Sequence, residues 1–163
     1  MKKIELLKKS HDRKGFDCGD STLNQFLQRT ARQHIQKGIS RTFVLVEKKN
    51  PLDIIGFFTL SLCEVEVNRL PPRWVKKYPS VVPGIKLARL AVAIDWQSQG
   101  VGKALLIDAV RRASLIAENA GVIGLFVDAK NASAKAYYEQ YGFEAAMKHS
   151  LLLFLPLSSF SGL

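Results

Sequence analysis

In the amino-terminal half of this chain, apolar and polar residues follow a strand pattern in three places and a helix pattern in one. Residues 42–47 and 54–67 are rich in β-branched and aromatic residues, and residues 49–53 between them have the composition of a turn. Such runs predict two strands, and the short turn makes an antiparallel hairpin the expected arrangement. A shorter apolar run at residues 4–7 predicts a first strand.

The helix pattern covers residues 21–37. Asp20 or Ser21 can cap its first turn, and Gly38 can end it. An apolar stripe recurs at helical spacing; its members are Leu23, Phe26, Leu27, Thr30, Ala31, His34 and Ile35. Polar residues, among them Arg29 and Arg32, share the opposite face. We therefore expect one side of this helix in the core and a basic side in water.

The carboxy-terminal half predicts two strands at residues 85–92 and 122–127 and two helices at residues 101–119 and 131–140. The second strand is apolar throughout, which is typical of a strand buried inside a sheet. Residues 143–157 predict a last strand or hairpin arm. The expected core stripe of the longer helix comprises Ala104, Leu105, Ala109 and Leu115 or Ile116.

Together these elements run strand, helix, two strands, strand, helix, strand, helix, strand. This order predicts an α/β sandwich with a mixed sheet. The chain has 163 residues and is 47% hydrophobic, which is ample for a buried core, so we expect a single domain over residues 1–163.

The charge of the chain is strongly positive and unevenly placed. The formal net charge is +10, and residues 1–80 carry 16 Lys and Arg against 8 Asp and Glu, whereas residues 81–163 carry 8 against 6. This bias favours a polyanionic partner such as nucleic acid. The alternative is a small domain that is basic without such a partner.

Cysteine usage and hydropathy restrict the environment. The two cysteines, Cys18 and Cys63, lie far apart and have no Cys or His at metal-ligand spacing, so neither a disulfide framework nor a metal site is expected. The amino terminus is too densely charged for a signal peptide, and no apolar run reaches membrane-spanning length. We expect a cytoplasmic protein with no membrane contact.

Residues 68–84 have a different character, with prolines, basic residues and aromatic residues interleaved; the basic and aromatic members are Arg69, Arg73, Trp74, Lys76, Lys77 and Tyr78. One interpretation is a nucleic-acid surface with phosphate contacts and a stacking platform for a base. The other is a proline-rich connection that Trp74 anchors to the body of the protein.

The most specific local feature is the polar turn at residues 97–102, Gln-Ser-Gln-Gly-Val-Gly, between an expected strand and an expected helix. A strand that leads through a glycine-rich turn into a helix gathers unpaired backbone N–H groups and the positive end of the helix dipole at one point. This arrangement is suited to a phosphate group.

The same turn fits the pattern Gln/Arg-x-x-Gly-x-Gly/Ala of the GNAT superfamily of acetyl-CoA-dependent acyltransferases. Residues 131–143, Asn-Ala-Ser-Ala-Lys-Ala-Tyr-Tyr-Glu-Gln-Tyr-Gly-Phe, resemble the superfamily segment Asn-x-x-Ala-x-x-x-Tyr-x-x-x-Gly-Phe. Ser98 departs from the glycine that often stands at its position. The resemblance covers nearly the whole chain and implies the GNAT fold, with a mixed, mostly antiparallel sheet that is flanked by helices and splayed between strands 4 and 5.

The resemblance also implies the residues that hold acetyl-CoA, the expected co-substrate. The turn would bind the pyrophosphate, the main chain of residues 90–92 would hold the pantetheine arm and the thioester carbonyl, and two residues of the last helix would lie near the arm. The full set is Leu90, Ala91, Val92, Gln97, Ser98, Gln99, Gly100, Val101, Gly102, Lys103, Ala104, Asn131, Ser133 and Tyr138. Tyr138 matches the family tyrosine that protonates the departing thiolate, and its register with Phe143 selects it over Tyr137 and Tyr141.

A narrower resemblance joins three segments, residues 16–27, 87–92 and 127–130, to the GNAT toxins of type II toxin–antitoxin modules. These toxins acetylate the amino group of aminoacyl-tRNA and so block translation, and a ribbon-helix-helix antitoxin neutralises them. The resemblance further implies a homodimer, and contact with operator DNA together with the antitoxin.

The chemistry of the acceptor agrees with this substrate. An α-amino group has a pKa near 7.7 to 8.0, far below that of a lysine side chain, so it needs little help from a base to become a neutral nucleophile. Glu64 and Glu66 are the candidates for a base, although alternation along their strand makes them solvent-side residues. The suggested phosphate contacts for tRNA are Arg29, Arg32, Arg69, Arg73, Lys76, Lys77 and Arg89.

Two alternatives stay open at this point. One is a GNAT enzyme that acetylates protein N-termini or small amines such as polyamines and antibiotics. The other is a nucleic-acid or antitoxin binding module with a vestigial acyltransferase site, against which the intact Gly100, Gly102 and Tyr138 argue.

Overall fold

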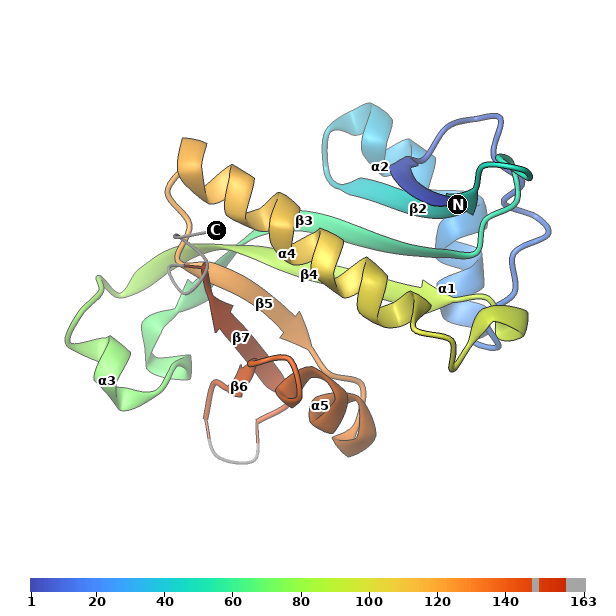
Figure 1. Ribbon diagram of the computed structural model, residues 1–163. Helices are drawn as coiled ribbons and strands as arrows, with labels where there is room; N and C mark the ends of the chain where they lie inside the picture. Colours follow the sequence, from blue (N-terminus) through green and yellow to red (C-terminus); the bar gives the residue numbers. More distant parts are fainter. Residues whose placement is uncertain (148–149, 158–163) are drawn as a thin grey trace. The chain divides into compact units, whose positions relative to one another are not determined.

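The computed structural model describes residues 1–147 and 150–157 (Figure 1). These residues fall into two units. Unit 1 contains residues 1–61 and 87–109, and unit 2 contains residues 62–86 and those from 110 onward. Strands β3 (Gly56–Glu66) and β4 (Val81–Val92) and helix α4 (Val101–Asn119) have residues in both. The expectation of a single domain stays a prediction.

The described strands form one mixed sheet in the order β1-β2-β3-β4-β5-β7-β6. The remaining strands are β1 (Lys2–Leu6), β2 (Arg41–Glu47), β5 (Gly124–Asp128), β6 (Glu144–Ala145) and β7 (Leu152–Pro156). The pairs β1–β2, β2–β3, β5–β7 and β6–β7 are antiparallel, and β4–β5 is parallel. The predicted mixed sheet and the β2–β3 hairpin are thus confirmed.

The parallel pairing of β4 with β5 is short. Its register comprises Ile85 with Leu125 and Lys86 with Phe126, although β4 has twelve residues. A pairing that covers so little of a long strand is what the expected splay between strands 4 and 5 requires.

In unit 1, the predicted helix over 21–37 is present in three consecutive parts. These are α1 (Ser21–Gln25), the π-helical segment η1 (Phe26–Thr30) and α2 (Ala31–Lys37). Asp20 caps the first turn by accepting hydrogen bonds from the backbone of Thr22 and Leu23, and Gly38 ends the helix at φ 73°. The π-turn was not predicted, because the apolar stripe was interpreted with regular α-helical spacing throughout.

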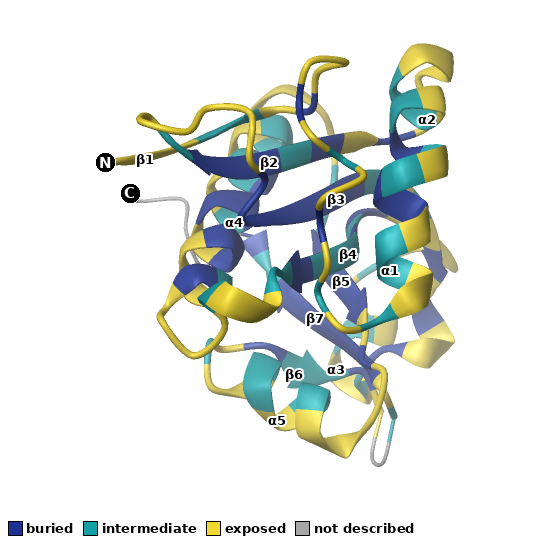
Figure 2. Ribbon diagram, turned by 90° about the vertical axis from the view of Figure 1, so that its right-hand side faces the viewer, coloured by how far each residue is buried: buried dark blue, intermediate teal, exposed yellow. Residues whose placement is uncertain are grey.

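The core of unit 1 forms where this helix packs on the first strands. Phe26, Leu27 and Ala31 of the predicted stripe are buried together with Val44 and Phe57 of the sheet. Figure 2 shows the same division on α2, with exposed residues along one side. The amphipathic pattern therefore correctly gave the buried face.

In unit 2, the proline-rich connection folds into η2 (Val67–Arg69) and the single-turn helix α3 (Pro72–Val75). Strand β4 then begins at Val81, four residues earlier than predicted. The apolar Val82 is buried with Phe126 and Phe154, and this packing extends the strand despite Pro83 and Gly84.

The last elements follow the sequence prediction closely, except for the core stripe of α4. Helix α5 (Ala132–Glu139) is capped by Asn131, and the expected arm is the antiparallel pair β6–β7. In α4, however, Ala104 and Leu115 are exposed and Ile116 is half-buried, whereas Leu106 and Ala113 are buried with Leu105 and Ala109. The predicted stripe was thus rotated slightly about the helix axis. Within the described residues, no helix has both the length and the apolar character that crossing a membrane requires.

Candidate functional site

The polar turn of the sequence motif is preformed and open in unit 1. A short 3-10 helix, η3 (Ile94–Trp96), leads into it, and α4 starts at Val101. Gly100 has φ 82°, and a Cβ added there would meet no atom within 4 Å. Ser98 has φ 62° and is the one non-glycine residue with positive φ among the described residues, which explains why glycine suits this position.

Side-chain hydrogen bonds hold this turn at both of its glutamines. Gln97 Nε2 donates to the carbonyl oxygens of Val92 and Cys18 at 2.9 and 3.0 Å, and Gln99 Nε2 donates to the Asp95 carbonyl at 3.0 Å. The first N–H groups of α4 have no acceptor within the helix, and the positive end of its dipole lies at the same point. The exposed residues 97–100 therefore fit a phosphate group.

The end of β4 lies in the same unit. Ala91 is buried, and Leu90 and Val92 are half-buried. Because the Val92 carbonyl already accepts a hydrogen bond from Gln97, less of its acceptor capacity is left for a ligand. The neighbouring Arg89 places its guanidinium carbon 3.8 Å from the centre of the Phe26 ring, and burial lowers the pKa of Arg89.

The residues predicted from the second motif lie in unit 2. Asn131 Oδ1 accepts the Ala134 backbone N–H at 2.9 Å, so this side chain caps α5. Ser133 is exposed. Tyr138 packs against Phe143 with ring centres 5.5 Å apart, and burial raises the pKa of Tyr138 to about 12. Its phenol is therefore fully protonated at neutral pH.

A second tyrosine shares this environment. Burial, followed by the adjacent Tyr141 and Tyr138, raises the pKa of Tyr137 to about 12, and the rings of Tyr137 and Tyr138 lie 5.4 Å apart. Geometry within α5 alone does not separate the two phenols, so the choice of Tyr138 stays a prediction from the motif register.

The basic residues predicted to contact RNA divide between the units. In unit 1, Arg29 is exposed, and Arg32 and Arg89 are half-buried. In unit 2, Arg69 and Lys76 are exposed, whereas Arg73 forms an ion pair with Glu144. Their exposure permits phosphate contacts, but Arg73 already has an anionic partner.

Trp74 is not available as a stacking platform for a base. Its ring stacks on Tyr78 at 5.5 Å, meets the edge of Phe154 at 5.6 Å, and has the Lys77 ammonium 5.1 Å from its centre. The half-buried Trp74 thus anchors the connection to the unit 2 core, as the second sequence interpretation proposed, and leaves phosphate contact as the possible RNA role of α3.

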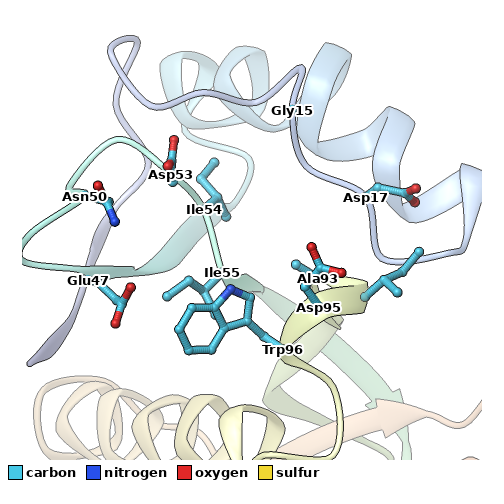
Figure 3. Close-up of a pocket in the computed structure, with 11 residues that line it drawn as sticks. Gly15, Asp17, Glu47, Asn50, Asp53, Ile54, Ile55, Ala93, Asp95 and Trp96 are labelled. Atoms are coloured by element: carbon cyan, nitrogen blue, oxygen red, sulfur yellow. The ribbon is translucent and has the colours of Figure 1, made fainter.

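The sequence did not predict a cavity in unit 1 that has a volume of about 440 Å³. Figure 3 shows Glu47, Asn50 and Asp53 on one wall and Asp95 with Trp96 on another. Four carboxylates line the cavity: Asp17, Glu47, Asp53 and Asp95. They would repel a pyrophosphate, so this cavity is distinct in chemistry from the glycine turn. The acidic residues are scattered along the sequence, so only the fold reveals the cluster.

The remaining candidate residues are two glutamates and two cysteines. Glu64 and Glu66 are exposed on β3. Cys18 and Cys63 are not in disulfides, and burial raises the pKa of both thiols. In the described part of the chain, no three His, Cys, Asp or Glu residues are grouped as metal ligands would be.

Residues 38–145 match the acetyltransferase (GNAT) domain family. The chain belongs to the GNAT acetyltransferases. A relative from Mycobacterium tuberculosis (strain ATCC 25618 / H37Rv), named tRNA-acetylating toxin, is 32% identical over 86% of this chain and 82% of its own. The resemblance inferred from the two motifs is therefore confirmed.

Solved structures of GNAT proteins superpose over almost the full chain. A tyrosine-to-phenylalanine mutant of KacT has 34% identity and a TM-score of 0.93, covering 99% of this chain and 98% of its own. AtaT complexed with acetyl-methionyl-tRNAfMet has 30% identity and a TM-score of 0.90, with the same coverage. The GNAT fold expected from the sequence is thus confirmed.

Other similar structures show these relatives with partners. They include AtaTR bound with AcCoA, a KacTA–DNA complex, and an AtaT mutant toxin bound to the C-terminus of the antitoxin AtaR. Their identities to this chain are 28, 32 and 29%, with TM-scores of 0.82, 0.83 and 0.81. All three cover at least 98% of this chain and 96% of their own.

Proposed function

We propose that this protein is a toxin that transfers an acetyl group from acetyl-CoA to the amino group of an aminoacyl-tRNA and so blocks translation. The observation that carries the proposal is the full-length similarity to AtaT, which is known in complex with acetyl-methionyl-tRNAfMet. The similarity to the tRNA-acetylating toxin of M. tuberculosis supports the same substrate.

The donor site rests on the glycine turn. The open Gly100, the preformed backbone of residues 97–102 and the start of α4 fit the pyrophosphate of acetyl-CoA. Acetyl-CoA supplies an activated thioester when bound. The contacts proposed for it are the residues that the sequence indicated: Leu90–Val92, the backbone of Gln97–Ala104, and Asn131 with Ser133. Because Oδ1 of Asn131 caps α5, its amide nitrogen is the atom left to contact the donor.

Tyr138 is the proposed general acid. Burial raises the pKa of this phenol to about 12, which makes it a weaker acid than an ordinary tyrosine. A thiol has a reference pKa near 8.5, so donation to the departing sulfur is uphill by on the order of 5 kcal/mol at about 1.4 kcal/mol per pKa unit. Short-range positioning and prompt return of a proton from the acceptor amine must therefore drive the transfer.

The acceptor amine needs little assistance on this account. The α-amino group of an aminoacyl ester is largely neutral near pH 8, so the nucleophile is present without a strong base. This agrees with the placement of Glu64 and Glu66 as exposed residues of an alternating strand.

The tRNA would be held by the basic residues predicted from the sequence: Arg29, Arg32, Arg69, Arg73, Lys76, Lys77 and Arg89. The ion pair of Arg73 with Glu144 makes Arg73 the weakest phosphate contact of this set, because binding would have to displace an existing partner.

The proposal extends to partners and place of action. A ribbon-helix-helix antitoxin is expected to neutralise the protein and to bring it to operator DNA, as the antitoxin and DNA complexes of AtaT and KacT suggest. A homodimer is the expected assembly. A toxin that acts on tRNA would work in the cytoplasm.

One observation favours a second candidate, acetylation of a cationic small amine such as a polyamine. Two residues that line the cavity with four carboxylates, Asp95 and Trp96, come directly before the donor turn in the sequence. A lining of carboxylates attracts cations. The net charge of +10 argues against this acceptor.

The experiment offers labelled acetyl-CoA with charged tRNA, uncharged tRNA, a peptide set or spermidine. Label on charged tRNA alone, lost in Tyr138→Phe, is the expected result. Label on peptides or spermidine instead would replace the proposal with the second enzyme class. Absence of all transfer, together with salt-sensitive binding of RNA or DNA, would indicate a binding module.

A further inference from the structure

The segment at residues 16–27, which the sequence singled out as typical of GNAT toxins, has no part in the transfer chemistry described above. It begins with a tight turn in unit 1. The Gly19 backbone N–H donates to Asp17 Oδ1 at 2.8 Å, and Gly19 has φ 89°. This is an Asx-type turn, in which the Asp17 side chain bonds the backbone two residues on.

The Asn24 side chain of helix α1 holds this turn through two hydrogen bonds. Asn24 Oδ1 accepts the Cys18 backbone N–H at 2.9 Å, and Asn24 Nδ2 donates to Asp17 Oδ1 at 3.0 Å. These bonds to Gly19 and then to Asn24 hold the pKa of Asp17 below its ordinary value. Both polar ends of the Asn24 amide are thus engaged by two successive residues.

The turn at residues 17–19 is bonded to the segment that leads into the acetyl-CoA turn at residues 97–102. The Cys18 carbonyl accepts from Gln97 Nε2 at 3.0 Å, and the Asp17 carbonyl accepts from the Ile94 backbone N–H at 2.9 Å. Gln97 Nε2 also bonds the Val92 carbonyl at the end of β4. We call this chain of bonds through Asp17, Cys18, Asn24 and Gln97 the clasp.

We propose that the clasp positions the acetyl-CoA turn, and that Asn24 and Gln97 are positioning residues for the donor. The assignment of the turn to acetyl-CoA rests on the proposed function. The Gln97 side chain bonds protein carbonyls, so it acts on the donor through the backbone of residues 98–102. The turn needs such support, because Ser98 is held in a left-handed conformation that costs roughly 1–2 kcal/mol for a side chain with a Cβ.

Loss of the clasp should weaken donor binding without removing any group that contacts the reacting atoms. An unheld turn would spend part of its time in other conformations, and apparent affinity falls in proportion to the competent fraction. The expected signature is a higher Kd and a higher KM for acetyl-CoA. In Asn24→Ala, which alters no residue assigned to donor binding, kcat at saturating acetyl-CoA should stay unchanged.

The test compares Asn24→Ala, Gln97→Leu and the double variant of the full chain by calorimetric titration with acetyl-CoA alone. We expect each single change to raise Kd about tenfold, the loss of one or two hydrogen bonds, with Tm close to wild type. The Kd of the double variant should be no higher than that of the single variant with the higher Kd, because both changes disrupt the same chain of hydrogen bonds. Gln97→Arg, unlike Gln97→Leu, should bind acetyl-CoA with a Kd close to that of the wild type, since a guanidinium can donate to two carbonyls.

The matched control is Asn119→Ala. Asn119 Nδ2 donates to the Leu115 carbonyl at 2.9 Å in the last turn of α4, so this variant also loses one side-chain-to-backbone bond. Its Kd for acetyl-CoA should equal that of the wild type.

Unchanged Kd in both clasp variants would overturn the proposal, and so would additive losses in the double variant. The exposed Gln97 gives a test even if Asn24→Ala fails to fold. A wild-type protein that binds acetyl-CoA but leaves aminoacyl-tRNA unmodified would refute the proposed substrate and not the clasp. A wild-type protein that does not bind acetyl-CoA would refute both.

Discussion

Three tyrosines of one short segment share an aromatic environment, and only one of them, Tyr138, has a proposed chemical role. Tyr138 stands in register with Phe143 and packs on its ring. Tyr137 has the same raised pKa of about 12, so burial alone cannot identify the acid. The spacing of the motif favours Tyr138 over Tyr137 as the general acid, and kinetic measurements can test this choice.

Tyr138→Phe should lower the transfer rate at least about 10²-fold, the usual contribution of a general acid, while Kd for acetyl-CoA changes little. Tyr141→Phe serves as control, because it removes a neighbouring phenol from the same cluster, and should keep the wild-type rate. Steady-state transfer to charged tRNA measures both. A Tyr138→Phe variant with wild-type kcat would remove the role assigned to this residue.

The same burial makes an alkaline prediction about stability. Below pH 10 the phenol is protonated in both the native and the unfolded chain. Between pH 10 and 12 the unfolded tyrosine ionises and the native Tyr138 does not, so the free energy of unfolding falls as pH rises. Urea titrations over this range should show a shallower fall for Tyr138→Phe than for Tyr141→Phe, and equal slopes would contradict the buried phenol.

Ser98 shows what a residue pattern can and cannot predict. The motif located the turn, and the departure from glycine was visible, but only the structure shows that φ is 62° there. Ser98→Gly should therefore stabilise the protein by up to about 1 kcal/mol, the relief of left-handed strain less the entropy cost of glycine. Thermal unfolding measures this, with Gln99→Gly as the control that should destabilise it.

At the scale of elements, patterns with a regular period were predicted well and irregular ones were not. The helix over 21–37 had a clear cap and stop, and both Asp20 and Gly38 act as predicted. The start of β4 was missed because Pro83 and Gly84 suggest a loop, whereas burial of Val82 against the unit 2 core decides the local structure. The clasp was missed because it links Asn24 to Gln97 through bonds that both make to Cys18, and no local pattern spans the distance from residue 18 to residue 97.

Two basic residues at helix α3 differ in whether they already have an anionic partner, and this difference can be tested. Lys76→Ala should reduce the slope of log affinity for tRNA against log salt by roughly 0.7–0.9, the value for one phosphate contact. Arg73→Ala should change the slope less, because Arg73 is paired with Glu144. Filter binding at several salt concentrations measures both slopes. Equal reductions in the two variants would show that the ion pair opens on binding.

At the scale of the whole molecule, the basic charge and the acidic cavity favour opposite acceptors. The net charge of +10 attracts a polyanion, whereas the four carboxylates of the cavity attract a cation. The GNAT family accounts for the donor, and its relatives that act on tRNA favour the polyanion.

The identity of the acetylated group is the most direct test of this account. Charged tRNA would be incubated with acetyl-CoA and the protein, then cut with ribonuclease, and the aminoacyl-adenosine of its 3′ end would be weighed by mass spectrometry. The account predicts an aminoacyl-adenosine heavier by one acetyl group, absent with Tyr138→Phe. An unmodified aminoacyl-adenosine, under conditions in which the protein acetylates spermidine or a peptide, would contradict it.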